Sequence, residues 1–324
     1  MDKLLEVKEL KKYFAVPGGF LHAVDNVNLS VNRGETMGIV GESGCGKSTL
    51  GRVILRLLEP TAGRILYAGM DITSFESEEM RYMRKYMQII FQDPYASLDP
   101  RYTISQTIEE PLKHHKIYKS ETERKNRIKE LMEMVGLSER VMNAYPHEFD
   151  GGRRQRVVIA RALAISPQFI VCDEPVSALD VSVQAQILNL MIELQEKLEL
   201  TYIFISHDLS VIKHISNNIA VMYLGEVVEL SPKNEVFRKP MHPYTIALLS
   251  AIPSINLHAK KQRIILKGEI SSPVNPKPGC RFAPRCPFAA DSCTQANIPL
   301  IEAEKDHFVA CIRYKELLEG IINF

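Results

Sequence analysis

Residues 41–48 form a glycine-rich segment that could bind the phosphates of a nucleotide. Their sequence, GESGCGKS, fits the pattern G-x-x-x-x-G-K-[S/T], although an ordinary glycine-rich turn is the alternative. In this pattern the glycines let backbone N–H groups point at phosphate oxygens, the lysine contacts the β- and γ-phosphates, and the following hydroxyl binds Mg²⁺. We expect ATP to contact Gly41, Glu42, Ser43, Gly44, Cys45, Gly46, Lys47, Ser48 and Thr49.

Four polar residues that follow apolar runs are candidates for the hydrolytic chemistry. Asp173 and Glu174 follow FIVC at 169–172, Gln92 follows MQIIF, and His207 follows YIFIS. One carboxylate of the pair can reach a magnesium ion while the next activates a water that attacks the γ-phosphate. We predict Ser48, Gln92 and Asp173 as Mg²⁺ contacts, and Glu174, Gln92 and His207 as catalytic residues. A lone histidine at a strand end is more often structural, so His207 depends on the order of the whole set.

For these residues to lie together, each must directly follow the end of a buried strand. ETMGIV at 35–40 precedes the glycine-rich segment, and TLGRVILRLLE at 49–59 has helical spacing. FIVC and YIFIS are also followed by segments with helical spacing, and buried strands that alternate with helices are typical of a parallel sheet. Residues 4–10 and 21–31 instead alternate apolar and polar side chains, which predicts antiparallel strands with one solvated face.

Two further regions differ from these strands and helices in composition and in the spacing of their apolar residues. The stretch between Gln92 and Asp150 is mostly helical and charged, so we expect an inserted helical subdomain at about 93–160. Prolines recur after about residue 232, which predicts a loop-rich tail that is short of periodic elements. We therefore predict a nucleotide-binding domain at 1–235 and a C-terminal extension at 236–324.

Composition indicates a cytoplasmic protein without a general attraction to nucleic acid. The 40 basic and 39 acidic residues leave a formal net charge of +1, which exerts no global pull on polyanions. No stretch approaches the ~18–20 apolar residues that a membrane-spanning helix needs, and the first residues lack the apolar run of a secretory signal.

Taken in order, the motifs resemble those of the ATP-binding-cassette (ABC) ATPases over about residues 4–235. The resemblance rests on Gly41–Ser48, Gln92, Asp150-Gly151-Gly152 with Arg154-Gln155-Arg156, Asp173-Glu174, Ser177-Ala178-Leu179-Asp180 and His207. It implies an α/β fold: a P-loop NTPase core with an antiparallel β subdomain, an inserted helical subdomain and a loop-rich C-terminal extension. Tyr13 or Phe14 falls where the family stacks an aromatic ring on adenine, with Phe14 slightly favoured by spacing and core packing as the alternative.

The resemblance also implies a dimer that sandwiches two ATP molecules. Asp150, Gly151 and Gly152 would complete the ATP site of the partner, and Ser177, Ala178, Leu179 and Asp180 would form the dimer D-loop. Asp150 departs from the family, which normally has serine there. Asp is as good a helix N-cap as Ser, but an ionised carboxylate cannot donate to a γ-phosphate and repels it. We expect the site that this segment completes to be weaker than usual.

Longer motifs resemble the oligopeptide, dipeptide and nickel importer ATPases within that family. They are FQDPYASLDPR at 91–101, HPYTIALLSAIP at 242–253 and PVNPKPGCRFAPRCPFAADSC at 273–293. They imply an ATPase that powers import of dipeptides or oligopeptides from the cytoplasmic face of the cell (inner) membrane, to which it binds peripherally. The alternatives are nickel or oligosaccharide import, a regulatory ATP-binding module with little hydrolysis, and a non-transport ABC ATPase.

The same resemblance implies the partners. They are transmembrane permease subunits, a second ATPase subunit that is a paralogue or an identical chain, and, indirectly, an extracytoplasmic substrate-binding protein; no nucleic acid is expected. In the family a coupling helix of the membrane subunit docks just after Gln92. Tyr95, Leu98 and Tyr102 are candidates for this contact, with local packing as the alternative.

Four clustered cysteines, Cys280, Cys286, Cys293 and Cys311, follow the pattern C-x5-C-x6-C-x17-C. Disulfides are disfavoured in a reducing cytoplasm, and structural zinc sites usually have closer pairs. Ligation by four cysteines is normal for a [4Fe–4S] cluster. We expect such a cluster as a structural staple, with zinc or uncomplexed thiols as the alternatives.

Overall fold

The chain forms two compact units in the computed structural model, which describes residues 2–252, 264–266, 268 and 272–322. Unit 1 comprises Met1–Leu4, Asn32–Glu35 and Ser74–Ile205, and unit 2 comprises Leu5–Val31, Thr36–Thr73 and Ser206–Phe324. The division predicted near residue 235 stays a prediction. The motif at 242–253 ends at Pro253, which lies outside the described residues.

Parallel, fully buried strands form the centre of unit 1. Here β7 (Phe169–Asp173) pairs on one side with β6 (Met87–Ile90) and on the other with β8 (Thr201–Ser206), both in parallel. Every residue of β7 and β8 is buried, which agrees with the continuous apolar runs in their sequences. The carboxyl end of β7 is the point at which the predicted catalytic acids leave the sheet.

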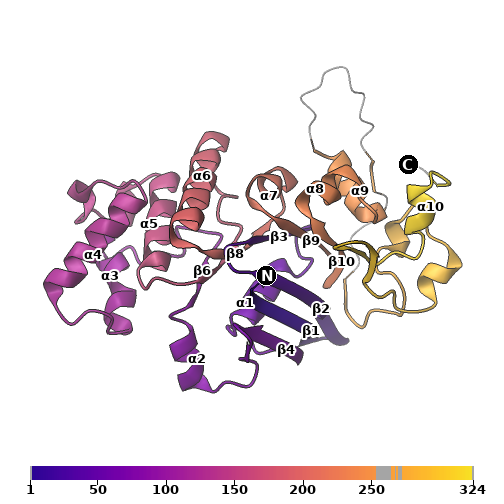
Figure 1. Cartoon of the computed structure of the whole chain (residues 1–324), viewed down its shortest axis with the longest axis horizontal. Coiled ribbons are helices and arrows are strands. Elements are labelled where there is room, and N and C mark those ends of the chain that lie inside the picture. Colours follow the sequence, from indigo (N-terminus) through magenta and orange to yellow (C-terminus); the bar gives the residue numbers. More distant parts are fainter. Residues whose placement is uncertain (1, 253–263, 267, 269–271, 323–324) are drawn as a thin grey trace. The chain divides into compact units, whose positions relative to one another are not determined.

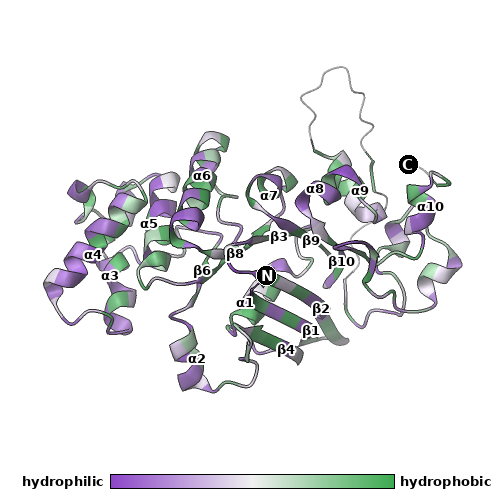
Figure 2. Ribbon diagram, in the orientation of Figure 1, coloured by the Kyte–Doolittle hydropathy of each residue, from purple (hydrophilic) through white to green (hydrophobic). Residues whose placement is uncertain are grey.

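Helices account for much of the rest of unit 1 (Figure 1). They are α2 (Ser77–Met83), α3 (Ile104–His114), α4 (Glu121–Met134), α5 (Gly151–Leu163) and α6 (Val181–Leu198), with the 3-10 turns η1 (Glu139–Val141) and η2 (Pro146–Glu148). Thr103 and Ser120 begin α3 and α4 with capping boxes. In α4 the buried residues are Ile128, Leu131 and Met132, on an otherwise mostly hydrophilic helix (Figure 2).

Two sheets organise unit 2. The first has the order β2-β1-β4-β5, formed by β1 (Lys3–Val16), β2 (Gly19–Asn32), β4 (Ala62–Tyr67) and β5 (Met70–Asp71). The pairs β1–β4 and β4–β5 are antiparallel, and the alternating segments at 4–10 and 21–31 lie in β1 and β2, as their patterns predict. In the second sheet β3 (Thr36–Val40) pairs in parallel with β9 (Asn218–Tyr223), and β9 pairs antiparallel with β10 (Glu226–Pro232).

The C-terminal extension continues this second sheet. The hairpin β11 (Ile301–Glu304) and β12 (His307–Val309) adds to β10 in antiparallel register. Among the described residues of unit 2, the helices and 3-10 turns are α1 (Lys47–Ile54), α7 (Leu209–Ile215), α8 (Lys233–Arg238), α9 (Pro243–Ser250), η3 (Ala283–Arg285), η4 (Asp291–Thr294) and α10 (Tyr314–Leu318). The predicted loop-rich tail therefore also contains a hairpin, whose strands are too short to show a clear alternation in sequence. Within the described residues, no helix has both the length and the apolar character needed to cross a bilayer.

A buried carboxylate joins the extension to the sheet. Glu229 of β10 has no exposed surface, and its oxygens accept hydrogen bonds from the backbone N–H groups of Met241 and His242 at 2.8 and 2.9 Å. The Nε2 atom of His307 in β12 lies 2.8 Å from the same carboxylate. Because buried charge is costly without partners, these contacts fix the start of α9 and the position of the hairpin together.

We predict that Glu229→Ala lowers the free energy of unfolding by about 3 kcal/mol or more, since it removes the shared acceptor of a buried network. Denaturant unfolding of the full chain measures this. The control is Lys305→Ala, an exposed position in the β11–β12 turn, where we expect a change within about 0.5 kcal/mol. Equal changes in the two variants would contradict the structural role of Glu229.

Candidate functional site

The loop between β3 and α1 has the backbone that a phosphate-binding segment needs. Gly44 and Gly46 have φ angles of 77° and 105°, which glycine adopts without strain. A Cβ atom at Gly46 would lie 2.0 Å from the carbonyl oxygen of Ala23, and one at Gly41 would lie 2.2 Å from that of Met222. Glycine is required at both positions because backbone from β2 and β9 passes directly against the loop.

Lys47 begins α1 and folds across this loop. Its side chain is almost fully buried, and Nζ donates hydrogen bonds to the carbonyl oxygens of Gly41 at 2.9 Å and Glu42 at 3.0 Å. No side chain caps the first turn of α1, and uncapped helix N–H groups favour anions. Ser48 and Thr49 lie in the same turn, so the predicted phosphate and magnesium contacts of unit 2 are adjacent.

The predicted catalytic acids lie together in unit 1. Asp173 is the buried last residue of β7, and Glu174 follows it with a left-handed φ of 49°. The N–H of Glu174 donates to the carbonyl of Ile205 at 3.0 Å, and the Nε2 of Gln92 donates to its carboxylate at 3.2 Å. Non-glycine residues hold left-handed angles only where surrounding contacts enforce them. The Gln92 and Glu174 side chains, 82 residues apart, are thus in direct contact.

The Asp150 side chain acts as the helix cap that its chemistry predicts. Its Oδ1 accepts from the N–H of Arg153 at 2.8 Å at the start of α5, and the side chain is 65% exposed. A Cβ atom at Gly152 would lie 2.6 Å from Cγ1 of Val183. Glycine there lets the start of α5 approach the start of α6.

Other predicted residues are placed as follows. The N–H of Leu179 donates to the carbonyl of Val176, and the Ser177 hydroxyl donates to the Glu174 carbonyl. This turn leads through Ala178 to Asp180, the N-cap of α6.

His207 belongs to unit 2 and is exposed just after β8. The phosphate loop is also in unit 2, whereas Gln92, Asp173, Glu174 and the segment at 150–152 are in unit 1.

Of the three candidates for a membrane-subunit contact, two are exposed. Leu98 is buried, which fits local packing, whereas Tyr95 and Tyr102 are 63% and 42% exposed. The guanidinium of Arg154 lies 3.6 Å from the centroid of the Tyr95 ring. This cation–π contact fixes the orientation of an otherwise exposed ring.

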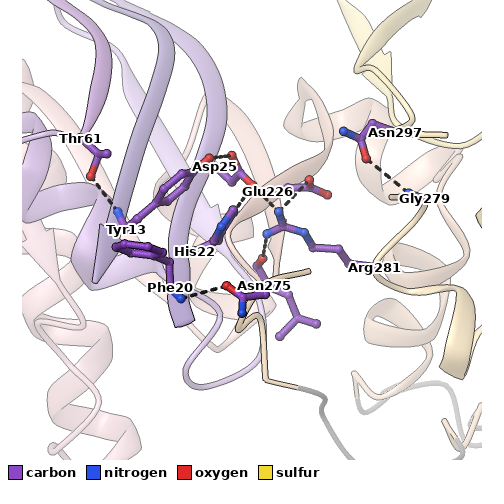
Figure 3. Close-up of polar contacts among 11 residues, drawn as sticks. Tyr13, Phe20, His22, Asp25, Thr61, Glu226, Asn275, Gly279, Arg281 and Asn297 are labelled. Atoms are coloured by element: carbon purple, nitrogen blue, oxygen red, sulfur yellow. Dashed lines mark hydrogen bonds and ion pairs between the residues drawn. The ribbon is translucent and has the colours of Figure 1, made fainter. Parts of the chain in front are cut away.

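Tyr13 is engaged in a polar cluster of unit 2 (Figure 3). Its ring stacks on His22 with centroids 3.8 Å apart, and its hydroxyl donates to Asp25 at 2.5 Å. Burial and the bond to Asp25 raise the pKa of Tyr13. Tyr13 therefore has one face and its hydroxyl committed to protein, while Phe14, the next residue of β1, carries the ammonium of Lys12 5.0 Å from its ring centroid.

Arg281, from the extension, completes this cluster and was not expected from the sequence. Its guanidinium contacts Asp25, the carbonyl of Leu224 and, at 3.3 Å, Glu226. Burial opposes ionisation of Asp25, but bonds from Tyr13 and His22 and the charge of Arg281 lower its pKa. Burial raises the pKa of Glu226 to about 7. Arg281 and Asp25 are 256 residues apart, and no local pattern connects them.

The four clustered cysteines line a single small cavity in unit 2. Cys280, Cys286, Cys293 and Cys311 share this cavity of about 20 Å³ with side chains that include His242, Phe282, Phe288 and Ile298. Burial raises the pKa of Cys280 to about 11 and that of Cys311 to about 12. Burial also raises the pKa of Cys286 and lowers that of His242 to about 3. Among the described residues, no group of three or more His, Cys, Asp or Glu side chains is arranged to hold a metal ion.

Comparison with protein families gives two matches along the chain. Residues 24–177 match the ABC transporter family, and residues 228–293 match the oligopeptide/dipeptide transporter C-terminal region. The first match includes the phosphate loop, Gln92 and the Asp173-Glu174 pair, and the second begins in β10 and includes three of the four clustered cysteines.

Individual relatives match over nearly the whole chain. The oligopeptide transport ATP-binding protein AppF of Bacillus subtilis is 50% identical over 97% of this chain and 98% of its own length. A putative peptide import ATP-binding protein of Brucella ovis is 49% identical over 96% of this chain and 98% of its own length. Full-length similarity at this level covers the cysteine-containing extension as well as the nucleotide-binding motifs.

Solved structures agree on the fold. The ATP-binding cassette MJ0796, in a dimeric post-hydrolysis state bound to ADP and Pi, is 32% identical, with a TM-score of 0.64 over 71% of this chain and 98% of that chain. The protein cbiO1 of Clostridium perfringens, part of the ABC transporter complex cbiONQ, is 29% identical, with a TM-score of 0.66 over 74% of this chain and 92% of that chain. The α/β fold predicted from the sequence is confirmed. The chain therefore belongs to the ABC transporter family, as an ATP-hydrolysing subunit of its oligopeptide and dipeptide transport group.

Proposed function

We propose that this chain hydrolyses ATP at a site shared with a second ATPase subunit, and that the hydrolysis powers import of dipeptides or oligopeptides through transmembrane permease subunits. The observation that carries the proposal is the Glu174 carboxylate, held by the Gln92 amide at the end of β7. Similarity to an oligopeptide transport protein and a putative peptide import protein over 97% and 96% of the chain supports the cargo class.

The residues present suit each step of the hydrolysis. The loop at 41–48 and Lys47 bind the phosphates, and the Ser48 hydroxyl with the Asp173 carboxylate supplies oxygen ligands of the kind that Mg²⁺ prefers. Bound Mg²⁺ would neutralise phosphate charge. Glu174 takes a proton from the attacking water as the bond to the γ-phosphorus forms, and the bond to the leaving oxygen of ADP breaks. His207 is the proposed contact of the γ-phosphate.

We further propose Phe14 as the ring that stacks on adenine. Tyr13 has its hydroxyl bound to Asp25 and its ring stacked on His22, so it serves the internal structure of unit 2. Phe14 is part-exposed on the neighbouring position of β1, where alternate side chains point to opposite faces.

Replacing Glu174 with Gln should reduce ATP turnover by about 100-fold or more, since a positioned general base contributes at least that factor. Tight ATP binding should persist, because the phosphate loop is unchanged. Steady-state turnover and retained nucleotide, measured on the full chain with its partner subunit, test both points. Glu196→Gln, an exposed change on α6, is the matched control. Turnover of the Glu174 variant close to that of the control would exclude Glu174 as the base.

The segment at 150–152 is proposed to complete the ATP site of the second subunit. Asp150 already uses one carboxylate oxygen to cap α5, and its negative charge would face a γ-phosphate. A regulatory module with little hydrolysis is the second candidate function, and Asp150 is the residue that favours it.

Asp150→Ser should raise turnover or ATP affinity by up to about fivefold, because exposed charge interactions are worth about 0.2–1 kcal/mol. Serine keeps the helix cap and adds a donor. Asp150→Asn, which also keeps a cap but removes the charge, should give part of the gain. Initial rates over a range of ATP concentrations measure the effect. Identical kinetics for the parent and both variants would show that Asp150 does not weaken the site.

Assembly at the cytoplasmic face of the cell membrane follows from the proposed function. The exposed rings of Tyr95 and Tyr102 are the proposed contacts of the permease coupling helix. An extracytoplasmic substrate-binding protein acts only indirectly, by delivering cargo to the permease. The second ATPase subunit is either a paralogue or an identical chain.

We propose that the four-cysteine cavity binds a [4Fe–4S] cluster. Its support is the donor set, four cysteines that line one cavity with apolar walls. Each cysteine of a cubane cluster binds a different iron, so the sulfurs need not converge on one point as they must around a single zinc ion. The cluster would stabilise the fold of the extension by linking the segments that carry the four cysteines. Because burial raises the thiol pKa values, loading must release protons and is favoured by rising pH.

Protein purified without oxygen should contain about four irons per chain with acid-labile sulfide. Cys293→Ser should remove most of the iron, since it deletes one of the four ligands. Cys172→Ala, at a buried cysteine of β7 outside the cavity, should leave the iron content unchanged. Zinc, or no metal, in the parent protein would overturn the cluster proposal and leave the ATPase assignment intact.

A further inference from the structure

Glu42 places a negative charge inside the loop that is proposed to bind the phosphates of ATP. It is the second residue of the loop, and its side chain is 24% exposed. An unpaired carboxylate so close to bound phosphates would repel them, and the low dielectric of a partly buried site would strengthen the repulsion. The structure gives this charge a specific partner.

That partner is Arg285 of the C-terminal extension. Its two terminal nitrogens donate to the two Glu42 carboxylate oxygens at 2.7 and 3.1 Å, a bidentate pair of the strong kind. The Arg285 side chain is 9% exposed, and the bond to Glu42 raises its pKa further. One guanidinium nitrogen also lies 3.4 Å from the Tyr223 hydroxyl.

The backbone of Glu42 is held as well. Its N–H donates to the hydroxyl of Tyr244 in α9 at 2.8 Å, and its carbonyl accepts from Lys47 at 3.0 Å. Tyr244 is fully buried and packs against Phe282, with ring centroids 5.4 Å apart. The first turn of the phosphate loop is therefore supported by side chains of the extension, in addition to its own lysine.

Arg285 lies in a short segment, Cys280–Cys286, that is fixed at several points. Its 3-10 turn includes the bond from the N–H of Arg285 to the carbonyl of Phe282 at 2.9 Å, and the N–H of Cys280 donates to the carbonyl of Cys293 at 2.8 Å. Arg281 in the same segment bonds to Asp25 (Figure 3) and to the carbonyl of Leu224. These contacts fix the segment that carries the guanidinium of Arg285.

From these contacts we infer that Arg285 is a positioning residue of the ATP site: it neutralises and orients Glu42 so that the phosphate loop accepts polyphosphate. The inference rests on the proposed ATP site and adds to it a residue from outside the nucleotide-binding motifs. Arg285 acts on the nucleotide through Glu42 and does not contact it.

We expect the effects of substitutions at Arg285 and Glu42 on ATP affinity to be non-additive, because the two charges are paired. Arg285→Gln alone should weaken ATP binding by about tenfold, because it leaves the Glu42 carboxylate without its charged partner. The double variant Glu42→Gln/Arg285→Gln should recover most of the affinity that Arg285→Gln loses, since the repelling charge is gone. Arg285→Lys should recover part of the loss, and the deficit of Arg285→Gln should shrink at high salt.

The experiment measures the Kd of ATP for each full-length variant by titration, together with its thermal unfolding without nucleotide and its iron content. Arg238→Gln is the control, since it breaks another Arg–Glu pair of unit 2 far along the chain from the loop, in which two guanidinium nitrogens donate to one carboxylate oxygen of Glu235. We expect the control to bind ATP like the parent.

Two results would overturn the inference. One is an unchanged Kd in Arg285→Gln when the parent binds ATP normally. The other is a loss of affinity that Glu42→Gln does not relieve, which would mean that Arg285 only stabilises the fold. Failure of the parent itself to bind ATP would instead count against the proposed function.

Discussion

The close approach of three backbone segments at Gly46 is the constraint on which the rest of unit 2 depends. Gly46 lies against the carbonyl of Ala23 in β2, and Gly225, in the turn between β9 and β10, lies against that of His22. The N–H of Gly225 donates to the carbonyl of Cys45 at 2.8 Å. The phosphate loop, the first sheet and the second sheet therefore meet at one point where no side chain fits.

The same meeting point explains why residues near both ends of the chain belong to one site. Once β2 and the β9–β10 turn are fixed against the loop, Asp25 and Leu224 are close enough for Arg281 to bond to both. Glu229 then ties the next part of the chain to β12. The extension is in this way part of the packing around the loop. Its segment Cys280–Cys286 is anchored to β2 and to the β9–β10 turn through Arg281.

Local sequence patterns predicted the parts of the site that are formed by consecutive residues. The glycine-rich loop, the acidic pair after β7 and the cap at Asp150 each depend on a few neighbouring side chains and on strand or helix periodicity, so their structures follow from short-range rules. The contact of Gln92 with Glu174 was not predicted, although both residues were recognised as polar residues that follow apolar strands. Parallel strands bring such ends together.

Long-range contacts could not be predicted in this way. Arg281 with Asp25 and Arg285 with Glu42 join residues more than 240 positions apart, and arginines in a proline-rich tail carry no periodic signal. The β11–β12 hairpin was missed because three- and four-residue strands show no clear alternation. Which of the two adjacent rings is committed to contacts within the protein also depends on partners, His22 and Asp25, that only the folded chain reveals.

The position of Arg285 in the chain has a consequence for biosynthesis. It follows Glu42 by 243 residues, so at about 5–20 residues per second the ribosome makes the phosphate loop roughly 10–50 s before its arginine partner. A nascent chain that has passed His207 but not reached Arg285 already contains every nucleotide-binding motif, yet the carboxylate of Glu42 does not have this guanidinium beside it. A chain released before residue 285 would carry the same defect. Its phosphate loop would therefore bind ATP more weakly than the loop of the finished chain.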